Sequence, residues 1–496
     1  MTHQNHPNGE EESRVARGRR AFDDAYRRAE SFLDVGQGHA FRVLWFFLPE
    51  TSVIHQVRFQ AVFASRFFSD AGQQALAYGA LVAVVRAGGS ALDAALLGVA
   101  ALLPPALFGL YGGAVADALP RRIALAVIYN AQALLCFAAP GLIGTELGGL
   151  MLLLFAVNLL GQVSGPSESA VVPLVASETQ LASAASMLSL ASSLGTAFGM
   201  ALLAPILVRV FSVDVVIYFA GAMLLIAASR VFDLPAHASD PGDRLELERV
   251  LRKVSYRSTI TWFARQPAVA TMVFVAVLAG TAQIVVQTLA PRYVQAVLEV
   301  DAADAVYVFA PSALGLALAV IVTPLLVRRR GERMIALVGF VLVTASLCCF
   351  GLVADLTWID PANPLRVLTP LGLDLELRLR TAALFALPLG FGLALTSISV
   401  QTYINRRVPL ASQGRAFALQ SSLKNGVAII PLVALGLAAA EFGVASVLVA
   451  SPFLLLALAI ALLRINRYLA GNDEPGQLME LATYWEEPPA LETPDR

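Results

Sequence analysis

Long apolar runs separated by short polar segments dominate the chain between residues 61 and 464. An α-helix of roughly 20 apolar residues crosses the hydrocarbon core of a bilayer, which is about 30 Å thick. Twelve runs reach that length and are expected to span a membrane, at 61–85, 93–116, 123–145, 147–166, 181–208, 214–232, 268–290, 304–327, 334–354, 381–404, 416–438 and 443–464. The pattern therefore predicts an all-α membrane protein with twelve transmembrane helices.

A polar segment divides these runs into two sets of six. It covers residues 233–266 and contains DRLELERVLRKVSYRST, whose apolar positions partly suit one face of a surface helix. The run FRVLWFFLPE, near residue 45, is too short to span and predicts an interfacial helix. The expected organisation is an N-terminal tail (1–60), a six-helix half (61–232), a cytoplasmic linker (233–266), a second six-helix half (267–465) and an acidic, disordered tail (466–496).

Composition agrees with a membrane protein and excludes several other classes. Hydrophobic residues make up 57% of the chain, charged residues 14%, and the mean hydropathy is +0.69, whereas soluble domains carry about 25% charged residues. A net charge of -1 provides no basic field for nucleic acid. The sequence has no phosphate-binding loop and no spacing of Cys or His typical of a metal site. We therefore expect no enzyme, no cofactor and no nucleic-acid partner.

The distribution of basic residues predicts how the chain is oriented. With both termini inside, 27 of the 35 Lys and Arg residues lie on the cytoplasmic side and six lie in outer loops. Basic residues concentrate on the cytoplasmic side of membrane proteins. The first 40 residues are polar and lack the apolar core of a signal peptide. We expect a multi-pass protein of the plasma (inner) membrane with both termini in the cytoplasm.

Short internal similarities indicate that the two sets of six helices are homologous. VPLVAS at 172–177 resembles VPLAS at 408–412, LASSL at 190–194 resembles LQSSL at 419–423, and RRIAL at 121–125 resembles ERMIAL at 332–337. Each pair is separated by roughly half of the chain. This agreement predicts two pseudo-symmetric halves, as in many transporters.

The loop between the second and third expected spans carries a charged motif, GLYGGAVADALPRRIAL, at residues 109–125. Its Gly113, Asp117, Arg121 and Arg122 have the spacing of the loop motif of the major facilitator superfamily, which this chain resembles over about 60–465. The motif departs from the family pattern at Ala118 and Pro120.

The resemblance implies the major facilitator fold and a cytoplasmic gate at this loop. In the family, the motif acid faces the helix N-terminus of span 11, near Gly414 here, where backbone amides attract negative charge. Contacts of this kind form when the cytoplasmic side is closed and break when it opens. The alternative is that Arg121 and Arg122 only set topology.

Two further stretches resemble exporters of the macrolide-efflux and enterobactin-exporter type. They are PSESAVVPLVASETQLASAASMLSLASSLGTAFG around span 5 and RRVPLASQGRAFALQSSLKNG entering span 11. The familiar drug antiporters carry an Arg in span 4, where this chain has Asn158, and a Gly-rich span 5, where it has only Gly195, Gly199 and Pro205. Their proton-coupling arrangement is therefore not carried over.

Ionisable residues inside a span are functional candidates, because charge is costly in a bilayer. Arg66 and Asp70 lie one helical turn apart in span 1. Asp70 is expected to be the only acid inside a span away from its end, which makes it the candidate proton carrier with Arg66 as its counter-charge. A purely structural ion pair is the alternative. Lys424, at the start of span 11, is expected to snorkel to the cytoplasmic interface.

Uncharged polar side chains in the spans are candidates for a substrate cavity, although each could equally form a hydrogen bond between helices. They are Gln73, Gln74, Tyr78, Asn130, Asn158, Gln162, Gln283, Gln287, Gln401 and Tyr403. The sequence thus predicts a monomeric secondary active exporter of small amphipathic molecules, working by alternating access, with the proton as coupling ion and the bilayer as its surroundings. A carrier of lysophospholipids or other lipid-like solutes, and a non-transporting receptor or assembly partner, remain alternatives.

Overall fold

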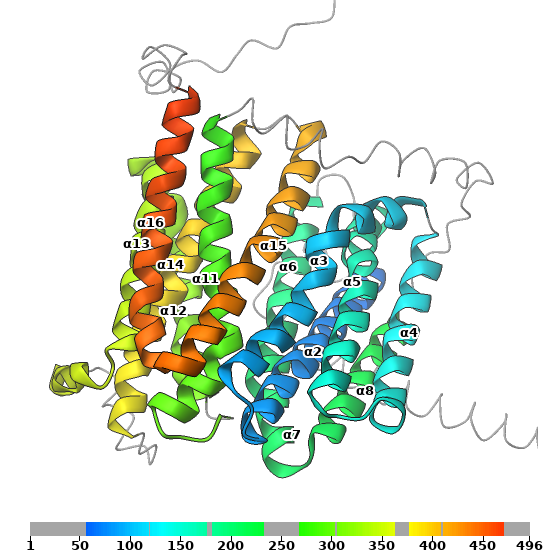
Figure 1. The fold of residues 1–496 in the computed structure, drawn as a ribbon. Helices are drawn as coiled ribbons and strands as arrows, with labels where there is room; N and C mark the ends of the chain where they lie inside the picture. Colours follow the sequence, from blue (N-terminus) through cyan, green and yellow to red (C-terminus); the bar gives the residue numbers. More distant parts are fainter. Residues whose placement is uncertain are drawn as a thin grey trace, which may run out of the picture.

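The computed structural model describes residues 56–118, 120–175, 181–232, 267–302, 305–362, 376–407 and 410–470, and these are almost entirely helical (Figure 1). The expected interfacial helix near residue 45, the linker 233–266 and the tail from residue 471 lie outside these ranges. Within them, every expected span corresponds to a helix.

The first half comprises α2 (Val57–Arg86), α3 (Ala91–Ala118), α4 (Arg121–Leu142), α5 (Leu147–Val175), a broken fifth span and α8 (Val213–Val231). The fifth span is α6 (Leu181–Ala197), the π-helical turn η3 (Phe198–Leu203) and α7 (Ala204–Val210) in series. The second half comprises α11 (Pro267–Val297), α12 (Ala305–Arg330), α13 (Glu332–Gly351), α14 (Leu377–Arg407), α15 (Leu410–Phe442) and α16 (Val444–Ala470), with a short 3₁₀ helix, η5 (Asp355–Ala362), before α14.

Ten stretches of the described helices are long and apolar enough to cross a membrane. The first span, α2, is not among them, because it carries Arg66, Asp70, Gln73 and Gln74 along its length. A helix this polar is stable in a bilayer only when neighbouring helices cover its polar face. The first span is therefore where buried chemistry is expected.

The packing confirms that the two halves are equivalent. In the first half α2 packs on α6 and α8, α3 on α5, and α4 on α5 and α8. In the second half α11 packs on α15 and α16, α12 on α14, and α13 on α14 and α16, which is the same set of neighbours shifted by six spans. The halves meet where α3 lies beside α15 (Figure 1). They also meet where η3 touches α12, and these two contacts are equivalent.

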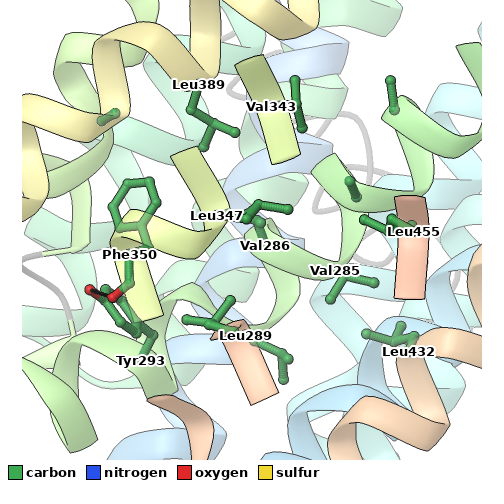
Figure 2. Packing of buried hydrophobic residues seen from close by; sticks show 14 of the residues in the cluster. Val285, Val286, Leu289, Tyr293, Val343, Leu347, Phe350, Leu389, Leu432 and Leu455 are labelled. Carbon is green, nitrogen blue, oxygen red and sulfur yellow. Dashed lines mark hydrogen bonds between the residues drawn. The ribbon is translucent and has the colours of Figure 1, made fainter. Parts of the chain in front are cut away.

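Interdigitated apolar side chains hold the second half together around α11 (Figure 2). The Tyr293 hydroxyl donates a 2.8 Å hydrogen bond to the Phe350 carbonyl of α13, and the two rings meet edge to face. The same contact surface includes Val285, Val286, Leu289, Val343, Leu347, Leu389, Leu432 and Leu455. Lipid is as apolar as these side chains, so close packing rather than water exclusion stabilises the bundle.

Glycines allow the tightest backbone contacts. A Cβ atom at Gly112 would lie 2.1 Å from the carbonyl oxygen of Gln162, so α3 and α5 touch through their backbones. Pro166 follows Gln162 by one turn and has no N–H to donate to that carbonyl. Small residues at such crossings are a general means of joining helices in membranes.

The fourth span is longer than the sequence pattern predicted. The expectation was an end near residue 166, but α5 continues to Val175 and includes the polar stretch SGPSES. Proline and serine interrupt helices less readily in membranes, because neighbouring helices satisfy the freed backbone groups. The consequence is that Glu168 lies inside a helix.

We predict that Gly112→Val lowers the thermal unfolding temperature of the purified protein in detergent. The valine must displace α3 from α5, and overpacking of this kind typically costs about 1–3 kcal/mol. Gly141→Val is the matched control, because a Cβ atom there would meet nothing within 4 Å. Equal unfolding temperatures for the two variants would show that the α3–α5 contact is not tight.

Candidate functional site

Arg66 is the centre of a cluster of polar side chains buried inside the first half. Its Nη1 donates to Glu168 Oε2 at 2.6 Å, and its Nε lies 2.8 Å from Asp70 Oδ2. Its Nη2 donates to Ser192 Oγ at 3.3 Å. The Tyr129 hydroxyl donates to the other oxygen of Glu168 in a very short hydrogen bond. We refer to these five side chains as the Arg66 cluster.

Four different helices supply the Arg66 cluster. Arg66 and Asp70 are one turn apart on α2, Tyr129 comes from α4, Glu168 from α5 and Ser192 from α6. One guanidinium therefore ties the first span to three others.

Glycines on α5 and α6 make room for the Arg66 cluster. A Cβ atom at Gly195 would lie 2.4 Å from the Phe67 carbonyl oxygen, so α6 approaches α2 one turn from Ser192. A Cβ atom at Gly165 would lie 3.8 Å from Arg66 Nη1, one turn before Glu168.

The two carboxylates of the Arg66 cluster differ in accessibility. The Glu168 side chain is 1% exposed and is held by both Arg66 and Tyr129. The Asp70 side chain is 15% exposed, and its ion pair with Arg66 is close but not aligned as a hydrogen bond. Asp70 is therefore the more accessible of the two carboxylates, while Glu168 is the better-aligned partner of Arg66.

Charge counting shows what the Arg66 cluster can do chemically. With both acids ionised, two carboxylates face one guanidinium, and the cluster carries one negative charge in excess. Excess charge inside a membrane is costly, and one proton neutralises it. The arrangement can thus hold a proton, and the most accessible place for that proton is Asp70.

The expectation that Asp70 is the only acid inside a span is wrong, because Glu168 lies within α5 and is more deeply buried. The polar stretch SGPSES resembled a loop. A usable signal was present, since the apolar residues AVVPLV begin two residues after Glu168 and indicate a continuation of the span.

A second feature is a cavity of about 170 Å³ between the two halves. Three of the predicted cavity residues line it: Tyr78 of α2, and Gln283 and Gln287 of α11. Most of the other lining is apolar and includes Met200 of η3 and Phe309 of α12. The cavity thus combines an apolar wall with a few amide and hydroxyl groups.

Two predicted cavity residues lie elsewhere. Asn130 is exposed on α4, donates to the carbonyl of Ala126 in its own helix, and lines a separate groove beside Arg122 and Phe232. Tyr403 lies near the C-terminal end of α14, where its hydroxyl accepts a 2.9 Å hydrogen bond from Arg333. It stands 14 residues beyond Leu389 of the cavity wall, about 21 Å along the helix. For these two the prediction is wrong, because periodicity does not reveal which way a helix face points.

The remaining predicted cavity residues are not among those that line this cavity. Asn158 and Gln162 donate to the carbonyls of Leu154 and Asn158, respectively, in their own helix α5. Gln73 lies where α2 approaches Gly161, Gln74 is half-buried, and Gln401 is exposed on α14.

The loop motif is only partly described. Gly113 and Asp117 lie in the last turns of α3, and Arg121 and Arg122 begin α4. The Arg122 guanidinium lies 5.8 Å from the centre of the Phe232 ring, in the same half. The side chains of Asp117 and of residues 410–418 are outside the described set, so the gate contact remains a prediction.

An ion pair joins the two halves at the end of the bundle that lies away from the loop motif. Arg86, the last residue of α2, makes three hydrogen bonds of 2.8–3.1 Å to the carboxylate of Asp301, which follows α11. Its Nη1 also donates to the Val208 carbonyl of α7 at 2.6 Å. From the sequence, Arg86 was only one of the six basic residues assigned to outer loops. Arg86 thus connects the first span to the second half and to the broken fifth span.

Within the described residues, no three His, Cys, Asp or Glu side chains are grouped so that they could hold a metal ion.

Comparison with solved structures identifies proteins of the same fold. A mutant of the nucleoside transporter NupG is 13% identical, with 82% of this chain and 99% of that chain covered at a TM-score of 0.64. A bacterial homologue of the human lysosomal transporter Spinster, inward-facing and unoccupied, is 14% identical, with coverage of 86% and 100% and a TM-score of 0.62. The POT family transporter PepTSo is 15% identical, with coverage of 84% and 98% and a TM-score of 0.57. No curated protein sequence matches the chain.

The family model of the Major Facilitator Superfamily matches residues 62–431. This range contains the loop motif, the Arg66 cluster, the cavity and most of both halves. The chain therefore belongs to the Major Facilitator Superfamily.

Proposed function

We propose that this member of the superfamily is a proton-coupled exporter of small amphipathic molecules. It would act as a monomer in the plasma membrane, with both termini in the cytoplasm. The observation that carries the proposal is the excess carboxylate of the Arg66 cluster, buried among four helices of a secondary transporter. Protonation of Asp70 changes the charge of that cluster, and a change of buried charge alters which conformation is favoured.

The cavity supports an amphipathic substrate. Its wall is mainly apolar, and Tyr78, Gln283 and Gln287 provide a few hydrogen-bonding groups. Binding sites of this composition take up molecules with a large apolar surface and orient them through a few polar contacts.

A lipid-like solute is the second candidate. The observation in its favour is the groove of Arg122, Asn130 and Phe232 on the outward face of α4, which combines a basic group with an apolar wall.

Rhodamine 6G accumulation in everted vesicles, with fluorescent lysophospholipid as competitor, distinguishes the exporter from the lipid carrier. Accumulation that a protonophore abolishes and lysolipid does not inhibit supports the exporter. Inhibition by lysolipid favours the lipid carrier, and no uptake of either compound favours a receptor.

We expect Asp70→Asn to abolish proton-driven accumulation while preserving exchange of labelled for unlabelled substrate. The amide keeps the size of the side chain but cannot lose a proton. Proteoliposome uptake with and without an imposed pH gradient measures the first property, and counterflow measures the second. Glu299→Gln, an acid with 73% exposure beside Arg378, is the control and should behave as wild type. Uphill transport at the normal rate in Asp70→Asn would make the Arg66 cluster purely structural.

Glu168→Gln should instead destabilise the fold. Arg66 keeps Asp70 as a counter-charge, but the charge-assisted hydrogen bonds that Arg66 and Tyr129 donate to Glu168 are weakened, and hydrogen bonds to charged groups contribute about 1.5–3 kcal/mol each. We expect a lower thermal unfolding temperature than that of Asp70→Asn. The reverse order would mean that Asp70 is the structural anchor.

The Arg86–Asp301 pair is expected to hold the outer side closed. Asp301→Arg places like charges together and should expose the cavity to the outside. A cysteine at Ala313, which lines the cavity, in a background without the three native cysteines, should then react faster with a membrane-impermeant thiol reagent. The exchange Arg86→Asp with Asp301→Arg should restore protection in part only, since the bond to Val208 is lost. Unchanged reactivity in Asp301→Arg would refute an outer gate here.

Asp117→Asn tests the predicted cytoplasmic gate. It removes the charge that the family resemblance places against the start of span 11. We expect normal insertion, strongly reduced transport and less crosslinking between the cytoplasmic ends of α3 and α15. Wild-type transport and crosslinking would mean that the motif serves only as a topological signal.

A further inference from the structure

Lys424 is an unusual residue in this chain. Of the 35 basic residues only two are lysine, Lys253 and Lys424. The sequence pattern placed Lys424 at the start of a span, within reach of the interface. In the structure α15 runs from Leu410 to Phe442, and its candidate membrane span begins at Leu419. Lys424 lies five residues, about 7.5 Å, inside that span, and its access to the interface stays a prediction.

The Lys424 side chain crosses from α15 to α11. A Cβ atom at Gly280 would lie 2.7 Å from Lys424 Cγ and 2.4 Å from its Cδ, so glycine is what allows the stem to pass. Gln283 and Gln287 follow Gly280 by three and seven residues and share its helix face. Both line the cavity. Lys424 therefore reaches the face of α11 that carries Gln283 and Gln287, about one turn before Gln283 and toward the side of the loop motif.

Among the side chains that the structure describes, no acid contacts Lys424. Within the described residues, it makes neither an ion pair nor a hydrogen bond. The helices packed most extensively on α15 are α3, α11, α14 and α16, and they contain only two acids, Asp93 and Asp117, both in α3.

The packing register places both acids of α3 out of reach of Lys424. Gly109 packs on Ser422, and Ala106 packs on Gly426, so Lys424 is level with the stretch 106–109 of α3. From there Asp117 is at least eight residues away, about 12 Å along the axis, and Asp93 is farther.

An ammonium inside an apolar span without a counter-charge is costly. We infer that Lys424 binds the anionic group of an amphipathic substrate, whose apolar part fills the cavity lined by Gln283 and Gln287. The inference rests on the proposed transport function and extends its substrate class, beside cationic amphiphiles such as rhodamine 6G, to amphiphiles with a carboxylate, sulfonate or phosphate group.

The binding test uses two dyes that share a xanthene ring system, anionic carboxyfluorescein and cationic rhodamine 6G. Binding to the full chain in nanodiscs is measured by fluorescence anisotropy, with empty nanodiscs as background. Lys424→Met should weaken carboxyfluorescein binding at least tenfold and change rhodamine 6G binding less than twofold. Lys253→Met is the matched control and should leave both unchanged. Equal weakening of both dyes, or no effect on either, overturns the inference.

The scarcity of lysine allows a direct observation of the ammonium. In Lys253→Arg, reductive ¹³C-methylation labels only Lys424 and the terminal amine, and it preserves their charge. Carboxyfluorescein should shift the Lys424 resonance, and rhodamine 6G should not. A resonance that responds to neither dye overturns the inference.

A transport assay distinguishes failure of the Lys424 anion site from failure of the proposed exporter function. Proton-driven efflux of rhodamine 6G that persists in Lys424→Met, without any Lys424 response to anions, retains the exporter and refutes the anion site. An anion-specific shift without any proton-driven transport supports the site and refutes the exporter.

Discussion

The pairing of one guanidinium with two carboxylates organises the first half of this transporter. Arg66 contacts acids on its own helix and on α5, and through Glu168 and Ser192 it connects α4 and α6. Between apolar helices in lipid the hydrophobic effect contributes little, so such polar ties and glycine crossings determine which helices adjoin. Among its described residues, the second half has no guanidinium between two carboxylates; it combines apolar packing around α11 with a buried pair between Arg380 of α14 and Asp360 of η5. In the proposed proton-coupled mechanism, protonation would act on one half only, and relative motion of the halves would follow from it.

Much of this architecture could be predicted from the sequence, because bilayer thickness imposes helix length and repeated motifs imply repeated packing. Twelve helices, the two equivalent halves and the Arg66–Asp70 contact all followed from local pattern. Glu168 did not, because a Pro- and Ser-containing stretch looks like a loop unless the neighbouring helices that support it are known. Asn130 and Tyr403 were misplaced for a related reason: hydropathy identifies a span, but only packing determines which of its faces meets lipid, another helix or the cavity.

The position of Lys424 extends the same lesson. Its depth depends on where α15 begins, and the sequence carries no sharp signal there. Its environment depends on a glycine on another helix, Gly280, more than 140 residues away in the chain. The functional reading of a charged residue in a span thus depends on the partner helices, and the absence of an acid at the same level is as informative as the presence of one.

The π-helical turn η3 gives the fifth span a property that a regular helix lacks. A π turn holds one residue more than an α turn, and removing that surplus would rotate everything beyond it by about 100°. Within this turn Met200 lines the cavity, and beyond it Val208 of α7 accepts the hydrogen bond of Arg86. An occupant that displaced Met200 would therefore apply torque to the segment that carries Val208. The broken span is a mechanical link along which ligand size can be transmitted to the far end of the bundle without unfolding a helix.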